Sequence, residues 1–191
     1  MAAGQLDQIV KRRGLPATGE FMLLFGLIAL DVVVRILPNT LNFSPVAASA
    51  LFAGAVLGRP LALAVPLAAM ALSDCVLGFD DWRMTIFIYA GLAMPAVLGL
   101  LTRSSWKPIR LVSLAALSSV FFFITSNFAV WMFSGIYARD IAGLVKCYIA
   151  ALPFFQNTLM GDLFWTAVLF GGLWVARLAL GGREPAARLA R

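Results

Sequence analysis

The feature that most constrains this chain is a succession of apolar runs, each ended by charged residues or by prolines and glycines. Hydrophobic residues fill 62% of the 191 positions, charged residues fill 13%, and the mean hydropathy is +0.92. A single water-soluble domain of this length cannot hide so much apolar surface in one core. The sequence therefore predicts an all-α integral membrane protein.

Cutting the chain at these interruptions gives six predicted transmembrane helices, at 21–37, 46–57, 61–77, 84–101, 111–133 and 157–180. They form one membrane domain over 21–180, between an N-terminal tail of residues 1–20 and a C-terminal tail of residues 181–191. The second run is shorter than the roughly 20 residues that a straight crossing needs. It either extends into residues 42–45 or is shielded by its neighbours.

The first apolar run follows Lys11-Arg12-Arg13, a pattern that also precedes the core of a cleaved signal peptide. Asp31 and Arg35 lie inside this run, four residues apart. That spacing favours a helix with its own ion pair over a plain signal-peptide core. The run is therefore predicted to stay in the protein as a membrane helix.

Basic residues are distributed unevenly over the predicted tails and loops. With six spans, both tails and the second and fourth loops share one side and hold most of the 15 lysines and arginines. The opposite side has Arg35, Arg83, Arg139 and Lys146. The positive-inside rule then places both termini in the cytoplasm. The net charge of +6 is thus a signal of topology, and it does not imply a nucleic-acid partner.

Polar residues gather near the predicted outer ends of the helices, in segments 39–45, 73–82, 127–137 and 152–162. Polar side chains in a membrane are costly unless they face a partner, a cavity or water. Their concentration on one side predicts an outward-facing pocket. The alternative is that these Asn and Asp residues are helix caps and loop residues.

Two further segments suggest how the helices pack. Residues 142–151 are too short to cross the membrane and are followed by Pro153, so they predict a short outer helix or a re-entrant lid on the last span. Ala50, Gly54 and Gly58 are spaced four residues apart and give the second run a nearly smooth face. Such a face allows close approach of another helix, from this chain or from a partner.

Several kinds of catalytic chemistry have no residues here to support them. The chain contains no histidine, which removes Ser/His and Cys/His nucleophile pairs and histidine metal sites. It contains neither a GxxxxGK[ST] loop nor a GxGxxG fingerprint, so the chain is not an ATPase by itself. Asp80 and Asp81 are adjacent carboxylates, which usually face water. A hydrolase is therefore poorly supported.

The two cysteines, Cys75 and Cys147, are both predicted on the outer side. They could form a disulfide in an oxidising compartment, or pack as small apolar side chains. A third reading is a soft thiolate ligand for a metal that arrives with a substrate. Cys75 follows Asp74 near the mouth of the predicted pocket, which makes it the stronger candidate for that role.

Four motifs together carry a family resemblance. They are RILPN with NFSPV at 35–46, LSDCVLGF at 72–79, TSNFAVW at 125–131 and CYIAALPFFQNTLMGD at 147–162. From about residue 35 to residue 171, the chain resembles the S components of energy-coupling factor (ECF) vitamin transporters. The resemblance is specifically to the cobalamin-binding BtuM type. It implies a six-helix protein of the bacterial inner membrane that binds cobalamin, or a related corrinoid, at its periplasmic face.

The resemblance also implies a role for the cysteine that follows Ser-Asp, which is Cys75 here. In that type the thiolate is an axial ligand of the corrinoid cobalt and supports removal of cyanide from cyanocobalamin. A soft, strongly donating thiolate would labilise the group across the ring. Three alternatives remain open, of which the first two are an S-component-like transporter of another small vitamin and a thiol-dependent corrinoid-processing protein. A third alternative is a membrane scaffold organised by the small-residue face.

A corrinoid is broad and carries amide-tipped side chains, so its pocket needs aromatic and aliphatic walls with a few polar partners. The candidate binding residues beside Cys75 are Asp74, Asn42, Ser44, Asn127, Trp131, Tyr137, Arg139 and Asn157. The expected partners are the lipid bilayer, the corrinoid and a separate ATP-driven ECF module. The Ala-x-x-x-Ala docking signature of S components is missing from the first helix, where the nearest approach is Gly26-x-x-Ala29.

Overall fold

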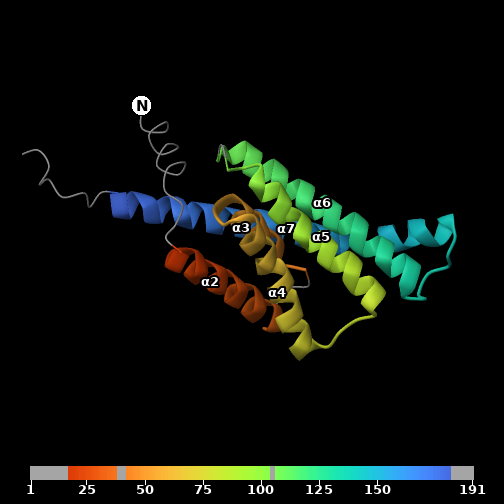
Figure 1. The fold of residues 1–191 in the computed structure, drawn as a ribbon. Coiled ribbons are helices and arrows are strands. Elements are labelled where there is room, and N and C mark those ends of the chain that lie inside the picture. Colours follow the sequence, from red (N-terminus) through yellow and green to blue (C-terminus); the bar gives the residue numbers. More distant parts are fainter. Residues whose placement is uncertain (1–16, 38–41, 104–105, 182–191) are drawn as a thin grey trace, which may run out of the picture.

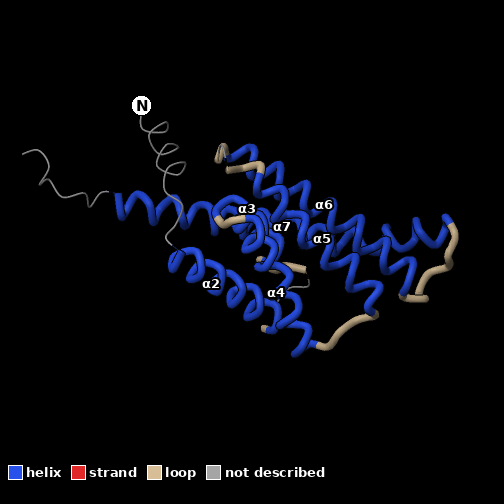
Figure 2. The backbone as a smooth tube through the Cα atoms, viewed as in Figure 1, coloured by secondary structure: helices blue, strands red, loops and turns tan. Residues whose placement is uncertain are grey.

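The structure is a computed structural model that describes residues 17–37, 42–103 and 106–181. Over these residues the chain is all-helical, and loops connect the helices without any strand (Figures 1 and 2). The helices are α2 (Ala17–Ile36), α3 (Val46–Val56), α4 (Arg59–Leu77), α5 (Trp82–Leu100), α6 (Pro108–Phe133) and α7 (Ile141–Gly181). The prediction of an all-α protein is confirmed.

Five of these helices, α2, α4, α5, α6 and α7, are long and apolar enough to cross a membrane. Many of their large apolar side chains are exposed on the outside of the bundle, which is the surface that lipid would cover. The chain is therefore a multi-pass membrane protein. The first turn of α2 and the last turn of α7 lie at the same end of the bundle (Figure 1).

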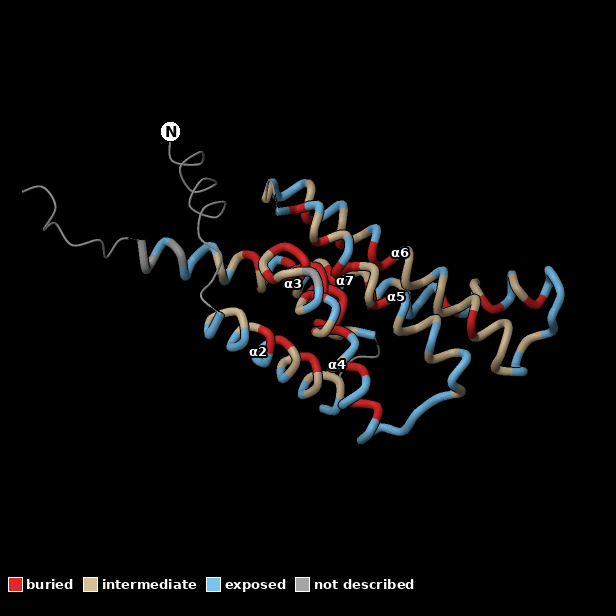
Figure 3. The backbone as a smooth tube through the Cα atoms, viewed as in Figure 1, coloured by how far each residue is buried: buried red, intermediate tan, exposed pale blue. Residues whose placement is uncertain are grey.

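The second predicted span is the short helix α3, with only 11 residues. At about 1.5 Å per residue it extends about 16 Å, roughly half of a 30 Å hydrocarbon core. All ten residues from Val46 to Ala55 are buried, and the buried backbone in Figure 3 is concentrated around α3. The expectation that neighbours shield this segment is confirmed, because α3 packs against α4, α5, α6 and α7.

Helix α3 crosses α5 at very short range through two glycines. A Cβ atom on Gly54 would lie 2.9 Å from Gly99 Cα and would collide with the backbone oxygen of Ala96. Ala50 is fully buried, whereas Gly58 lies outside α3 and caps the start of α4. The small-residue face thus serves packing within this chain.

The last carbonyl groups of α3 are satisfied by an arginine that follows α5. Nε of Arg103 donates to the Gly54 carbonyl over 3.0 Å, and its Nη2 donates to the Leu57 carbonyl. Carbonyl groups at a helix end lack partners within the helix, so a side chain has to supply them. Arg103 therefore fixes the C-terminal end of α3.

The prediction of a separate short helix or lid at 142–151 is wrong, because α7 runs without a break from Ile141 to Gly181. The segments on both sides of Pro153 pack on the same neighbour. The ring of Phe123 on α6 lies 5.4 Å from the Tyr148 ring and 4.8 Å from the Phe155 ring. Because α6 supports both segments, the missing proline N–H does not end the helix.

Candidate functional site

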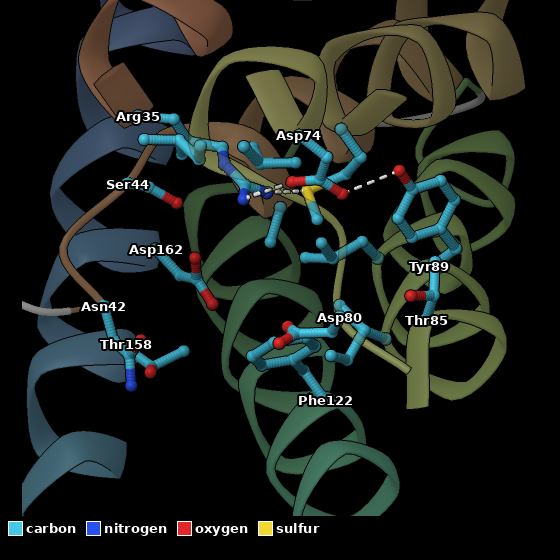
Figure 4. Close-up of a pocket in the computed structure, with 16 residues that line it drawn as sticks. Arg35, Asn42, Ser44, Asp74, Asp80, Thr85, Tyr89, Phe122, Thr158 and Asp162 are labelled. Atoms are coloured by element: carbon cyan, nitrogen blue, oxygen red, sulfur yellow. Dashed lines mark hydrogen bonds and ion pairs between the residues drawn. The ribbon is translucent and has the colours of Figure 1, made fainter. Parts of the chain in front are cut away.

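A cavity of about 360 Å³ lies between the helices, near the ends where α4 leads into α5. Its polar lining consists of Arg35, Asn42, Ser44, Asp74, Asp80, Thr85, Tyr89, Thr158 and Asp162, all of which are labelled in Figure 4. Its apolar lining comes from α3, α4, α5 and α6, including Met70, Leu92 and Phe122. Every described helix contributes to this wall, so the cavity depends on the whole bundle.

An ion pair and a tyrosine join three helices on one side of the cavity (Figure 4). Arg35 Nη2 on α2 donates to Asp74 Oδ1 on α4 over 2.9 Å, and the hydroxyl of Tyr89 on α5 donates to Asp74 Oδ2 over 2.8 Å. Arg35 Nη1 also contacts the sulfur of Met70. The side chains of Arg35 and Asp74 are only 22% and 12% exposed. Both carboxylate oxygens of Asp74 are thus occupied in a largely buried setting.

The helical repeat explains why α4 and α5 present these groups together. Met70, Asp74 and Leu77 are spaced by four and three residues, so they share one face of α4. Thr85 and Tyr89 are four residues apart on α5 and share its facing side. These two faces meet at the cavity, and Tyr89 reaches Asp74 directly.

The cavity wall formed by α7 contains a buried acid, Asp162. Its side chain is 4% exposed and borders the cavity (Figure 4). Ser119 on α6 lies 2.6 Å away, measured from Oγ to Asp162 Oδ2. No ion pair of the described residues includes Asp162, so Ser119 is its hydrogen-bonding neighbour in this part of the bundle.

The expected ion pair within the first span, between Asp31 and Arg35, is not formed. Arg35 pairs with Asp74 instead, and Asp31 is fully buried with its Oδ2 2.5 Å from Ser49 Oγ on α3. The i, i+4 spacing allowed the pair, but α2 packs along α4 and brings Asp74 to Arg35. Asp31 then faces α3, away from the cavity lining.

Residues just before α3 complete the opening of the cavity. Asn42 is exposed and has a φ of +63°, a left-handed backbone conformation that asparagine adopts more readily than most residues. Ser44, two residues later, also lines the cavity. Phe43 between them packs on α7, with its ring centroid 5.6 Å from that of Phe164. This contact anchors the segment that leads into α3.

Three of the predicted binding residues, Asn42, Ser44 and Asp74, line the cavity. Asn157 is half-buried on α7, next to the lining residue Thr158. Cys75 is exposed on α4 and is not among the lining residues. The proposed role of Cys75 as a cobalt ligand stays a prediction.

The other predicted binding residues lie where α6 turns back into α7, outside the cavity lining. Trp131 Nε1 donates to the Ala138 carbonyl over 2.9 Å, and Asn127 Nδ2 donates to the Phe123 carbonyl over 2.8 Å. Tyr137 is half-buried and Arg139 is exposed. The Trp131 side chain thus joins α6 to the α6–α7 connection. The expected contacts of these four residues with a corrinoid stay a prediction.

Cys147 belongs to the same region and is 2% exposed. Its sulfur donates weakly to the Asn127 carbonyl over 3.5 Å, which joins α7 to α6. Both cysteines are free thiols in the structure. Among the described residues, no three His, Cys, Asp or Glu side chains form a metal-binding group.

Sequence analysis missed Arg35 and Tyr89 as pocket residues. The sequence contained a signal for each residue. Arg35 lies within an apolar helix, where an arginine needs a partner or water. Thr85 and Tyr89 are also the polar positions of one α5 face, four residues apart. Neither signal identifies the partner, because that depends on which helices pack side by side.

Beside the cavity, Asp81 caps the start of α5. It accepts hydrogen bonds from the Arg83 backbone N–H over 2.8 Å and from Arg83 Nη2 over 2.8 Å. The side chain of Arg83, followed by its backbone N–H, holds the pKa of Asp81 below its ordinary value of 3.8. The neighbouring acid Asp80 lines the cavity. The two adjacent acids therefore differ in what they contact.

Residues 16–184 match DUF6580, which is described as a family of unknown function. No curated protein and no solved structure gives a significant match to the chain. The family match covers all six described helices, so the pattern shared within the family extends over the whole bundle.

Proposed function

The chain belongs to the DUF6580 family, and we propose that it is a transport protein that binds a small polar solute in the cavity of its membrane bundle. The observation that carries this proposal is the Arg35–Asp74–Tyr89 network in the cavity wall. Charged side chains within membrane helices are rare and typically mark a substrate or ion pathway. A purely structural pair would not require an adjoining cavity.

The charges of the lining define a class of solute. One basic residue, Arg35, faces three acidic residues, Asp74, Asp80 and Asp162. Asp74 neutralises Arg35, so the remaining acids favour a cationic or neutral polar solute over an anion. A cavity of about 360 Å³ lies near the lower end of the roughly 300–1,000 Å³ usual for ligand pockets, which favours a small molecule.

The proposed topology follows from the charge distribution. Most basic residues lie in the tails and in the loops that share a side with them, so we place both termini in the cytoplasm of a bacterial inner membrane. The cavity lies near the α4–α5 connection, on the opposite side. In this orientation the cavity takes up solute from the periplasm, and an S-component-like exchange with a separate ATP-driven ECF module would supply the energy.

A second candidate is uptake of cobalamin or a related corrinoid by a BtuM-type S component. The observation that favours it is the exposed thiol of Cys75, adjacent in the chain to Asp74 of the cavity wall. Cys75 would bind the corrinoid cobalt and assist removal of cyanide. A corrinoid is larger than a cavity of about 360 Å³ encloses, so this candidate requires the outer ends of the helices to move apart.

One experiment tests both candidates with protein purified without a histidine tag. Wild type, Asp74→Asn and Cys75→Ser are each incubated with cyanocobalamin or with one of a panel of small water-soluble vitamins. Bound compound is measured by native mass spectrometry and by visible absorption. The small-solute proposal predicts a vitamin that wild type and Cys75→Ser retain equally and that Asp74→Asn binds at least tenfold more weakly.

The corrinoid proposal predicts a different pattern in the same samples. Wild type would shift cyanocobalamin to a thiolate-ligated, cyanide-free spectrum, and Cys75→Ser would not. Retention of neither class of compound by the folded wild type would contradict both candidates and favour a scaffold role.

A further inference from the structure

Two buried acids of this bundle have the same unusual arrangement with a serine. Asp162 on α7 meets Ser119 on α6, and Asp31 on α2 meets Ser49 on α3. Each serine oxygen also lies within hydrogen-bond distance of a carbonyl of its own helix. The distances are 3.1 Å from Ser119 to Ala115 and 3.1 Å from Ser49 to Val46.

A count of protons shows what this arrangement allows. A serine hydroxyl has one proton to donate and lone pairs with which to accept. Ser119 therefore cannot donate to Asp162 and to Ala115 at once. If Asp162 is protonated, the acid donates to Ser119, and Ser119 donates to the Ala115 carbonyl. If Asp162 is ionised, Ser119 rotates its hydroxyl and donates to the carboxylate. Ser119 thus supports both protonation states.

Among the residues that the structure describes, no unpaired cation lies near Asp162 to keep it ionised. Helix α7 packs against α6 and α3. Helix α3 has no titratable side chain, and the ionisable residue of α6, Arg110, lies more than two turns from Ser119. Across the cavity are Asp74, Asp80, Tyr89 and Arg35, of which Arg35 is bound to Asp74. Burial without a paired cation favours the neutral acid.

The two acids differ in their access to the cavity. Asp162 borders the cavity, so a proton can be exchanged through it (Figure 4). Asp31 is 0% exposed and does not line the cavity, and its Oδ1 has no hydrogen-bond partner among the described residues. The Asp31–Ser49 pair therefore has no access to the cavity, whereas the Asp162–Ser119 pair does.

We propose that Asp162 is an exchangeable proton-binding site in the cavity wall, and that Asp31 keeps its proton as a structural group. Resting on the proposed transport function, this site links solute binding to protons. A cationic solute beside Asp162 favours the ionised acid, and loss of the solute favours its return to the protonated form. The solute and the proton then compete for the same carboxyl group.

The test needs no solute, so its outcome is independent of the proposed function. The full-length protein is reconstituted in lipid vesicles, and infrared spectra are recorded as the pH is varied. The protonated carboxyl C=O band is separate from the carboxylate band. At pH values where exposed carboxyls such as Asp81 are already ionised, wild type should still show one protonated-acid band, which disappears reversibly as the pH rises further. Asp162→Asn should lack this band. Asp31→Asn should keep it and should lose a second band that pH does not change.

Ser119→Ala provides a variant that keeps the acid. It should retain the titrating band and move its midpoint, while Ser118→Ala, which removes a neighbouring buried serine bonded to the Leu114 carbonyl, should leave the midpoint unchanged. The proposal is overturned if the titrating band survives in Asp162→Asn, or if wild type shows Asp162 ionised at every pH at which the bundle stays folded. It is also overturned if Ser119→Ala and Ser118→Ala behave alike.

Discussion

The guanidinium of Arg35 and the carboxylate of Asp74 lie 2.9 Å apart and connect α2 to α4 across 39 positions of sequence. The second oxygen of Asp74 accepts from Tyr89, so one carboxylate joins three helices. In a bundle whose interior is otherwise mostly apolar, this group fixes the arrangement of the helices around the cavity. It also leaves the cavity with polar atoms that a solute can reach.

Removing one member of this pair should cost more than removing both. Arg35→Met leaves Asp74 without its cation and should lower the free energy of unfolding by about 2 kcal/mol. This is less than the roughly 3–5 kcal/mol for a fully buried pair, because both side chains keep some exposure. The double variant Arg35→Met with Asp74→Leu should recover part of the loss. Denaturant unfolding in mixed micelles measures each value, and additive effects would contradict this coupling.

The contact between α3 and α5 should tolerate added side-chain volume poorly. Gly54→Ala places a methyl group against the backbone of Ala96 and Gly99, which are not flexible side chains. We expect the free energy of unfolding to fall by a few kcal/mol, or the variant to fail to fold, because the backbone must move. Gly171→Ala on α7 is the matched control, because nothing lies within 4 Å of its added Cβ. Thermal unfolding of both variants should separate them, and equal stability would show that α3 and α5 are not in close contact.

The fold could be predicted from sequence where a local pattern was sufficient. Long apolar runs identified five spanning helices, and the shortness of the run at 46–57 indicated a shielded segment. The continuity of α7 could not be predicted, because Pro153 is a helix breaker by local rules. What overrides it is the support that α6 gives to both Tyr148 and Phe155, a long-range contact.

The site was predicted only in part for a similar reason. Asn42, Ser44 and Asp74 are polar residues near helix ends, and their position in the sequence was enough to predict them as pocket residues. Arg35 has two possible ion-pair partners, an acid on its own helix and an acid on α4. Local spacing selects Asp31, whereas the packing of α2 along α4 selects Asp74. That choice is made by tertiary structure, and no local sequence pattern contains it.

The two cysteines should react very differently with a thiol reagent. In the folded, detergent-solubilised protein, N-ethylmaleimide should modify exposed Cys75 rapidly and should reach Cys147, which is 2% exposed, only after unfolding. Mass spectrometry of wild type, Cys75→Ser and Cys147→Ser identifies the modified residue. Labelling should vanish in folded Cys75→Ser and persist in Cys147→Ser. Protection of both cysteines, reversed by a reductant, would show a disulfide and contradict the structure.

The cap of α5 should give stability a defined dependence on pH. Arg83 bonds Asp81 through its side chain and its backbone N–H, and so lowers the pKa of Asp81 in the folded state below the ordinary 3.8. A carboxyl whose pKa is lowered by folding stabilises the protein fully above its unfolded pKa. That contribution is lost as the pH falls through the folded value of the pKa.

Asp81→Asn keeps an acceptor for the Arg83 backbone N–H but has no proton to gain. The difference in melting temperature between wild type and Asp81→Asn should therefore be constant near neutral pH and should shrink on acidification. A difference that stays constant down to the acid limit of folding would show that the carboxylate charge contributes nothing to this cap.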